Sequence, residues 1–153
     1  MRDATALVVL DTNIALDLLV FDDPAVQNLR EALAAGRLQW LATESTREEW
    51  RRVLDYPQIL RRAPAGSPRR AAALDAFDTL TRLVPTAAKA PFTCKDADDQ
   101  KFIDLAVAHR ATLLSKDAAV LCMARRLSRL GVCVCRQWNP DLCTDRLPEM
   151  SAA

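Results

Sequence analysis

An acidic residue that directly follows a short apolar run constrains this chain more than any other sequence feature. Residues 7–10 read Leu-Val-Val-Leu, and Asp11 comes next. A short run of this kind, with β-branched residues, is typical of a strand buried on both faces of a parallel sheet. Because open α/β sheets bind ligands at the carboxyl ends of their strands, Asp11 is a candidate ligand-binding residue. The alternative is that Asp11 only caps the helix predicted after it.

Strands and helices are predicted to alternate along the rest of the chain. Further short strands are expected at residues 38–42, 83–84, 112–115 and 132–135. Helices are expected at residues 14–19, 24–35, 68–82 and 118–130, from residue 43 or 45 up to residue 57, and from residue 96. This alternation implies an α/β fold with a mostly parallel sheet of about five strands. Residues 1–140 are expected to form one domain, and residues 141–153 a partly ordered C-terminal extension.

Composition excludes several classes of protein. The 153 residues suit one domain of ordinary size, and half of them are hydrophobic, which is enough for a full core. No apolar run is long enough to span a bilayer, and the N-terminus runs straight into the first strand without a signal peptide. The five cysteines are odd in number and irregularly spaced, which argues for reduced thiols rather than a disulfide framework. A cytoplasmic protein is therefore expected.

Three further acidic residues are predicted to lie at the same edge of the sheet as Asp11. Asp117 follows the strand at residues 112–115, whereas Glu49 and Asp99 lie on the core-facing sides of two helices. Close carboxylates repel one another by roughly 4 kcal/mol per pair at an intermediate effective dielectric, unless cations or protons neutralise them. Sites of several carboxylates suit Mg²⁺ or Mn²⁺, which polarise a phosphoryl oxygen and supply hydroxide near neutral pH.

Each of these acids also has a purely structural explanation. Asp117 can cap the next helix, and Asp96 is the natural cap of the helix that carries Asp99, where the macrodipole favours acids in the first turn. Beside Glu49, the pair Ser45 and Glu48 fits a capping box. The functional interpretation therefore depends on the acids meeting in one place, and not on any one of them.

The order and spacing of these motifs resemble a PIN domain, of the kind found as toxins in bacterial toxin–antitoxin pairs. The matching segments are Val-Val-Leu-Asp-Thr-Asn at 8–13, Glu-Trp at 49–50 with Val-Leu at 53–54 and Tyr-Pro at 56–57, Cys-Lys-Asp-Ala-Asp-Asp-Gln-Lys-Phe at 94–102, and Leu-Leu-Ser-Lys-Asp at 113–117. The resemblance extends from residue 7 to about residue 139 and implies a parallel sheet with helices on both faces. Trp50 departs from the family, which more often has a smaller aliphatic residue there.

The resemblance also implies a site and an activity. The residues that match the family's acidic site are Asp11, Glu49, Asp99 and Asp117. They would hold one or two Mg²⁺ or Mn²⁺ ions, with Asn13 and Ser115 as polar helpers and Asp98 at the rim. The implied activity is metal-dependent cleavage of single-stranded or structured RNA, leaving 5′-phosphate and 3′-hydroxyl ends. The implied protein partner is a cognate antitoxin, and a homodimer is left open.

A segment without acids is a second functional candidate. Residues 56–74 contain no acid, and their arginines are Arg61, Arg62, Arg69 and Arg70. These arginines have no local acidic partner in the sequence, and the loop expected at residues 61–68 contains two prolines and a glycine. The segment is either a solvated loop, a basic clamp for RNA, or a docking surface for an acidic antitoxin. Lys116 is a further candidate for contacting the RNA backbone.

Three other functions are considered. A receiver-like phosphoacceptor domain would need a paired acid after the first strand, and the single Asp11 followed by Thr-Asn fits poorly. A PIN-like domain could bind RNA or a partner without cutting it, although its acids are intact. A DNA-directed nuclease of related fold is the third alternative, and the short chain lacks obvious extra elements for gripping a duplex.

Overall fold

Five parallel strands form the centre of the structure, in the order β3-β2-β1-β4-β5. The structure is a computed structural model that describes residues 5–140. The strands are β1 (Ala6–Leu10), β2 (Leu38–Ala42), β3 (Thr81–Leu83), β4 (Thr112–Leu114) and β5 (Val134–Cys135). The predicted parallel sheet of five strands is confirmed. The C-terminal extension predicted at residues 141–153 lies outside the described residues.

The central strand β1 marks a reversal in the strand order. It pairs with β2 on one side and with β4 on the other. The chain first builds β2 and β3 on one side of β1, and then crosses over to build β4 and β5 on the other. At such a switch point the carboxyl ends of two neighbouring strands open a crevice. Asp11 directly follows β1 and Ser115 directly follows β4, so both residues lie at this crevice.

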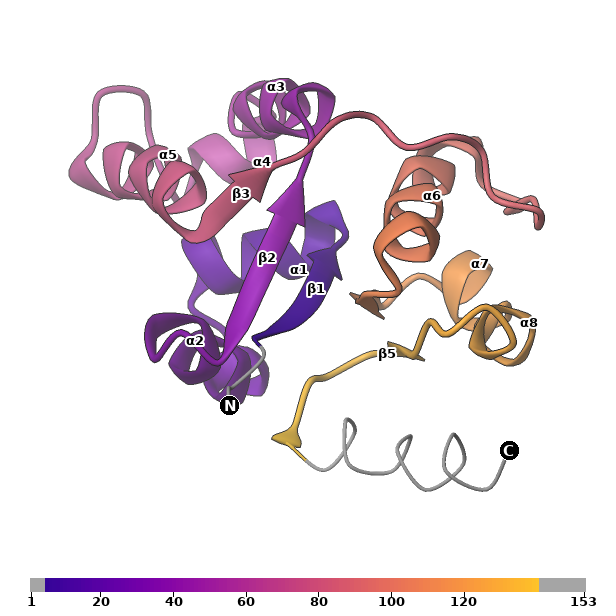
Figure 1. Cartoon of the computed structure of the whole chain (residues 1–153). Helices are drawn as coiled ribbons and strands as arrows, with labels where there is room; N and C mark the ends of the chain where they lie inside the picture. Colours follow the sequence, from indigo (N-terminus) through magenta and orange to yellow (C-terminus); the bar gives the residue numbers. More distant parts are fainter. Residues whose placement is uncertain (1–4, 141–153) are drawn as a thin grey trace.

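Helices cover both faces of the sheet (Figure 1). One face carries α1 (Thr12–Leu16), the π-helix η1 (Asp17–Phe21), the 3-10 helix η2 (Pro24–Val26), α2 (Gln27–Ala34), α3 (Glu44–Val53), α4 (Pro57–Leu60) and α5 (Pro68–Leu80). The other face carries α6 (Gln100–His109), preceded by the 3-10 helix η3 (Ala97–Asp99), and then α7 (Ala118–Leu121) and α8 (Ala124–Ser128). Within residues 5–140, no helix is both long and apolar enough to cross a membrane.

The alternation of side chains along each strand divides the core between the two faces. Val8 and Leu10 of β1 belong to the core under α1 to α5, whereas Val9 packs under α6 to α8. Trp40 and Leu41 of β2 divide in the same way. Because both faces are covered, the strands need apolar residues at consecutive positions, which explains the short continuous runs in the sequence.

Thr43, one of the two predicted starts, caps α3, but the capping box and the end of the helix differ from the sequence prediction. The capping box is formed by Thr43 and Thr46, whose side chains and backbone N–H groups bond reciprocally, and not by Ser45 and Glu48. The helix ends at Val53, and Pro57 opens α4 instead of closing α3. Proline suits the first position of a helix because that position needs no backbone donor.

Two other predicted helices also end early. The segment at residues 118–130 forms two short helices because Met123 bonds to the carbonyl of Val120, three residues back, which tightens the turn between α7 and α8. Thr81 and Arg82, predicted at the end of a helix, instead belong to β3, where they pair with β2. In both cases packing against the rest of the fold overrides the local preference for a helix.

Arginines from two other helices bind the backbone of η1. Arg30 of α2 donates to the carbonyl of Leu18 at 2.8 Å, and Arg69 of α5 donates to the carbonyl of Val20 at 2.7 Å. Both carbonyls belong to a π-helix, a rare conformation that needs support from its surroundings. These two arginines therefore fix the segment that follows Asp11 and α1 against α2 and α5.

The contact of Arg69 predicts a loss of stability when it is removed. We expect Arg69→Met to lower the free energy of unfolding by about 1–3 kcal/mol, because Val20 loses a hydrogen bond from a charged donor. Arg61→Met is the matched control, since Arg61 is exposed and its side chain makes no hydrogen bond or ion pair among residues 5–140. Urea denaturation of the two variants measures the difference. Equal stability would show that the hydrogen bond to Val20 contributes nothing.

Candidate functional site

Three aspartates meet beyond the carboxyl ends of β1 and β4. Asp96, Asp99 and Asp117 each offer a carboxylate oxygen, and these oxygens lie within 4.8 Å of one another. Asp96 caps η3, Asp99 is the last residue of η3, and Asp117 caps α7 just after β4. The fold therefore brings together two acids from one chain segment with an acid that follows a central strand.

Asp11 joins this group through Ser115. The Ser115 hydroxyl donates to Oδ2 of Asp11 at 2.5 Å and accepts the backbone N–H of Asp117 at 3.0 Å. Asp11 is only 3% exposed. Burial raises the pKa of the Asp11 carboxyl, and the charge of Asp117 raises it further, against the opposing effect of the hydrogen bonds from Ser115 and Ile14. Asp11, Ser115 and Asp117 thus form one connected unit across β1 and β4.

Asp99 is the most strongly perturbed acid of the group. Burial, together with the hydrogen bond and negative charge of Asp117, raises the pKa of the Asp99 carboxyl to about 7, and Asp96 and Asp11 add to the effect. Its Oδ2 atom is buried and has no hydrogen-bond partner among residues 5–140. A carboxylate oxygen in that position needs a proton or a cation. Several carboxylate oxygens around one point are the ligand set that Mg²⁺ and Mn²⁺ prefer, so the residues present fit a divalent ion.

The aspartates that lie at this edge of the sheet also cap helices. Asp11, Asp96 and Asp117 each use Oδ1 to cap the helix that follows. The donors are the backbone N–H groups of Ile14, Asp98 and Ala119, at 2.9 to 3.0 Å. Since a cap fixes the side-chain rotamer, each carboxylate keeps its second oxygen for other partners in a defined direction.

Asp96 is a member of the group that sequence reasoning treated only as a helix cap. Its spacing of three residues from Asp99 was the available signal, because residues three apart in one helical turn lie on the same side. The segment before Asp96 is held against α6 by two polar side chains. Gln100 accepts the N–H of Cys94 at 2.6 Å and donates to Asp104 at 2.8 Å, and Asp104 accepts the N–H of Ala90 at 2.8 Å.

Glu49 lies outside the group of three aspartates. Its Oε1 atom is 2.8 Å from Nζ of Lys101, in the first turn of α6, and the two side chains are 27% and 36% exposed. The structure therefore places Glu49 on the side of α3 that faces α6 and pairs it with a lysine. Asn13 and Asp98 are both exposed, and no hydrogen bond of either side chain is found among the described residues.

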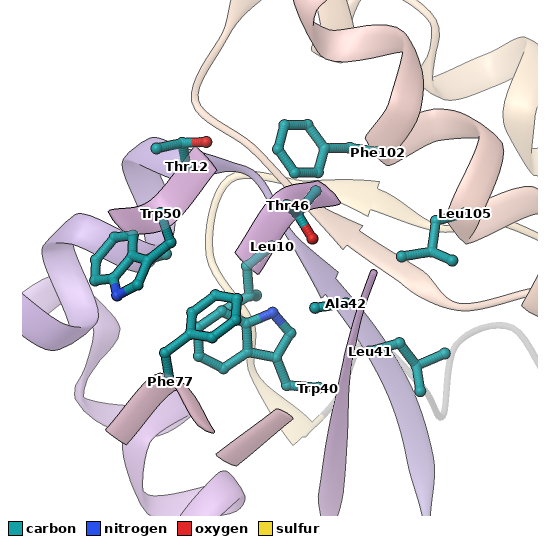
Figure 2. A pocket seen from close by; sticks show the side chains of 11 residues that line it. Leu10, Thr12, Trp40, Leu41, Ala42, Thr46, Trp50, Phe77, Phe102 and Leu105 are labelled. Carbon is teal, nitrogen blue, oxygen red and sulfur yellow. The ribbon is translucent and has the colours of Figure 1, made fainter. Parts of the chain in front are cut away.

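A small cavity separates α3 from α6 beside the acids (Figure 2). Its volume is about 20 Å³, which is room for about one water molecule. Thr46 and Trp50 line it from α3, Phe102 from α6, and Thr12 from the start of α1. Figure 2 shows the rings of Trp40, Trp50 and Phe77 gathered on one side and Phe102 on the other.

The aromatic cluster explains how Trp50 is accommodated. Trp50 stacks on Phe77 with ring centroids 5.7 Å apart, and Phe77 meets Trp40 edge-on at 5.0 Å. The indole N–H of Trp50 donates to the carbonyl of Ala73 at 3.4 Å. The large side chain at this position therefore anchors α3 to α5 and to the sheet, and Glu49 next to it remains at the surface that faces α6.

The candidate basic residues differ in how they are used. The prediction that these arginines lack an acidic partner is wrong for Arg70, which pairs with Asp55 at 2.7 Å and donates to the carbonyl of Leu54 at 2.8 Å. Arg62 lies over the ring of Phe21 at 5.0 Å. With Arg69 bound to η1, Arg61 and Arg62 are the members of the set whose side chains have no hydrogen bond or ion pair among residues 5–140.

Lys116 is bound within the fold rather than directed to solvent alone. Its Nζ lies 2.5 Å from Oδ2 of Asp17, a buried carboxylate at the start of η1. Asp17 would be left as a buried unpaired charge without this lysine. The contact joins β4 to η1 close to Asp11, so an RNA-contacting role for Lys116 would have to compete with Asp17.

The raised pKa of Asp99 predicts how stability changes with pH in chelator. The folded protein retains the Asp99 proton up to about pH 7, whereas an unfolded aspartate releases it near its ordinary pKa of 3.8. Between these values the folded state binds more protons, so the free energy of unfolding should fall as the pH rises, and level off above about pH 7. Thermal unfolding at a series of pH values tests this.

Asp99→Asn should lose this pH dependence, and Asp98→Asn, an exposed neighbour, should keep it. Adding Mn²⁺ at pH 8 should stabilise the parent protein, because an ion that binds only the folded state shifts the equilibrium towards it. The same pH dependence in Asp99→Asn and the parent would mean that Asp99 is not the titrating group.

Comparison with known proteins agrees with this arrangement. The sequence profile described as PIN domain matches residues 7–119, which include β1, α3, η3 and β4 and all of the acids described above. None of the curated proteins compared with the chain matches it. PIN domains are nucleases that typically use divalent metal ions, and a cluster of aspartates stands at the expected edge of the sheet. Because the match covers well over half of the chain, the chain belongs to the PIN-domain family.

Proposed function

We propose that this chain is an endoribonuclease that depends on Mg²⁺ or Mn²⁺. The observation that carries the proposal is the contact of Asp99 with Asp117, in which a buried oxygen of Asp99 has no hydrogen-bond partner. Such an arrangement is unfavourable in the empty protein and becomes favourable when a divalent cation is bound. In a PIN domain this supports a metal-dependent nuclease site.

Asp11, Asp99 and Asp117 would hold the ion, with Asp96 beside them and Glu49 contributing from α3. When bound, the ion would polarise a phosphoryl oxygen and lower the pKa of a water molecule. The Ser115 hydroxyl orients Asp11 by donating to Oδ2, while the N–H of Ile14 holds Oδ1. Asn13 is exposed next to Asp11, where its amide can donate to a phosphate oxygen of the substrate. Attack by water in line with the leaving oxygen would leave 5′-phosphate and 3′-hydroxyl ends.

The biological role that we propose is that of a toxin in a toxin–antitoxin pair, acting on single-stranded or structured RNA in the cytoplasm. The resemblance of the motifs to PIN-domain toxins supports this role, and the exposed arginines near residue 61 suit an acidic partner as well as RNA. A cognate antitoxin is the proposed protein partner, and a homodimer is a second arrangement. A small reading frame beside the gene, encoding an acidic or DNA-binding protein, would support the role.

One observation favours a second candidate function. Glu49 is paired with Lys101, and this pairing would remove one carboxylate from the metal site. A PIN-like domain in this state could bind RNA or a protein partner without cutting. Cleavage assays with purified protein separate the two functions.

Asp11→Asn is the variant that tests catalysis most directly. It keeps the shape of the side chain and removes a charge from the site, so we expect cleavage of single-stranded RNA to fall at least about 100-fold, with the fold retained. The stability of the variant in chelator should equal or exceed that of the parent, because repulsion with Asp117 is relieved. Circular dichroism and cleavage of a labelled oligonucleotide measure both effects.

The matched control is Asp75→Asn, an exposed aspartate on α5 that should leave cleavage unchanged. Undiminished cleavage by Asp11→Asn would remove Asp11 from the mechanism. Equal cleavage by the parent in Mn²⁺ and in chelator would show that no metal takes part.

The basic segment is tested with the two arginines that are not hydrogen-bonded within the fold. We expect the double variant Arg61→Ala, Arg62→Ala to bind RNA more weakly. If both side chains contact phosphates of a single strand, the slope of log affinity against log salt should fall by about 1.4. Fluorescence anisotropy across a salt series measures the slope. The control is Arg37→Ala, because Arg37 is exposed and lies at the amino end of β2, whereas the acids lie at the carboxyl edge of the sheet. An unchanged slope would show that Arg61 and Arg62 do not contact RNA phosphates. They would then be part of a solvated surface or of an antitoxin-docking surface.

A further inference from the structure

The ion pair of Glu49 and Lys101 lies where the two helical layers meet at the carboxyl edge of the sheet. Glu49 belongs to α3, whose apolar side packs in the core under α1 to α5, and Lys101 belongs to α6, which packs on the other face. The residues beside them, Trp50 and Phe102, line the same cavity from opposite sides (Figure 2). The ion pair therefore joins the two helices that form opposite walls of the cavity.

Lys101 is close in sequence to the acids that Glu49 is expected to join. It follows Asp99 by two residues, in the first turn of α6. Its ammonium also lies 5.2 Å from the ring centroid of Phe102, and its side chain is 36% exposed. A lysine so placed is held by Glu49 on one side and open to solvent on the other, and its long flexible side chain can exchange partners without a change in the backbone.

We propose that Lys101 is the resident counter-ion of Glu49 in the metal-free protein and a phosphate-binding residue in the metal-bound one. Glu49 turns from Lys101 to the divalent ion when the ion occupies the aspartate site. The ammonium that it leaves is then free to contact an RNA phosphate at the edge of the site. Lys101 is thus a substrate-contacting residue that competes with the ion for Glu49. This inference rests on the proposed function.

Charge balance supports such an exchange. In the metal-free protein, a unit positive charge on Lys101 balances the charge of Glu49. A divalent ion attracts Glu49 more strongly than an exposed ammonium does, because its charge is twice as large and it binds carboxylates directly. The RNA phosphate that then enters the site gives Lys101 a negatively charged partner in place of Glu49. Both states of the lysine are therefore paired.

Titration of Mn²⁺ into the protein, followed by calorimetry, tests the exchange without any cleavage. We expect Lys101→Met to bind Mn²⁺ about fivefold more tightly than the parent, because the competing unit charge is gone. Glu49→Gln should bind it more weakly. The gain in Mn²⁺ affinity from Lys101→Met should be smaller in the Glu49→Gln background, because that background lacks the Glu49 carboxylate for which Lys101 and the ion compete. An equal gain in both backgrounds would reveal simple charge repulsion and overturn the exchange.

RNA kinetics supply the second measurement. Lys101→Met should raise the KM for an RNA oligonucleotide while it tightens Mn²⁺ binding. A variant whose structure is merely loosened would bind both RNA and Mn²⁺ more weakly. Arg47→Met is the matched control. Arg47 also lies on α3 and forms an ion pair with Asp78 of α5 at 2.7 Å, and none of the aspartates of the proposed metal site takes part in that ion pair. It should change neither quantity. Lys101→Gln provides a second variant if Lys101→Met folds poorly.

The outcomes also separate this inference from the proposed function. A parent protein that binds no Mn²⁺ and cleaves no RNA would refute both. A parent that binds Mn²⁺ and cleaves RNA, beside a Lys101→Met variant with the same Mn²⁺ affinity and the same KM, would refute the role of Lys101 alone.

Discussion

The repulsion among the carboxylates at the carboxyl ends of β1 and β4 is the constraint on which the rest of this structure depends. Asp96, Asp99 and Asp117 converge there, with Asp11 linked to them through Ser115, and burial together with the charge of Asp117 raises the pKa of Asp99 to about 7. The surrounding fold resists this repulsion in three ways. Helix caps hold one oxygen of each of three aspartates. The Ser115 hydroxyl bonds to Asp11 across two strands, and Gln100 with Asp104 ties the segment before Asp96 to α6.

These restraints show why a structural and a functional explanation of the acids are compatible. A capping aspartate uses one oxygen for the backbone, and the cap fixes the direction of the other. Asp11 and Asp117 follow neighbouring parallel strands, so two independent caps hold carboxylates at the same edge of the sheet. The free energy of helix capping thereby offsets part of the repulsion, which allows the metal-free protein to keep its acids close together.

The sequence predicted the parts of the site that follow from local rules. The apolar runs of β1 and β4, the acids after them and the core-facing position of Asp99 depend on strand ends and helical periodicity, and these rules hold in a sheet covered on both faces. The ion pair of Glu49 and Lys101 joins helices from opposite layers. Arg70 forms an ion pair with Asp55, which lies one residue before the acid-free segment at residues 56–74. Such contacts depend on how the layers are packed, which periodicity does not specify. Asp96 was missed because its capping role already accounted for it.

A divalent ion would also change how the two layers are held together. In the described structure, the layers are joined at the carboxyl edge by Ser115 with Asp11, by Lys116 with Asp17 and by Lys101 with Glu49. Each is a contact between a group after β4 or in α6 and a group after β1 or in α3. An ion held by Asp11, Asp99 and Asp117 would join the ends of β1 and β4 to η3 by direct coordination. In the proposed site, metal binding would therefore be coupled to the docking of α6 against β1 and β4, because the acids that would hold the ion come from both sides of the crevice.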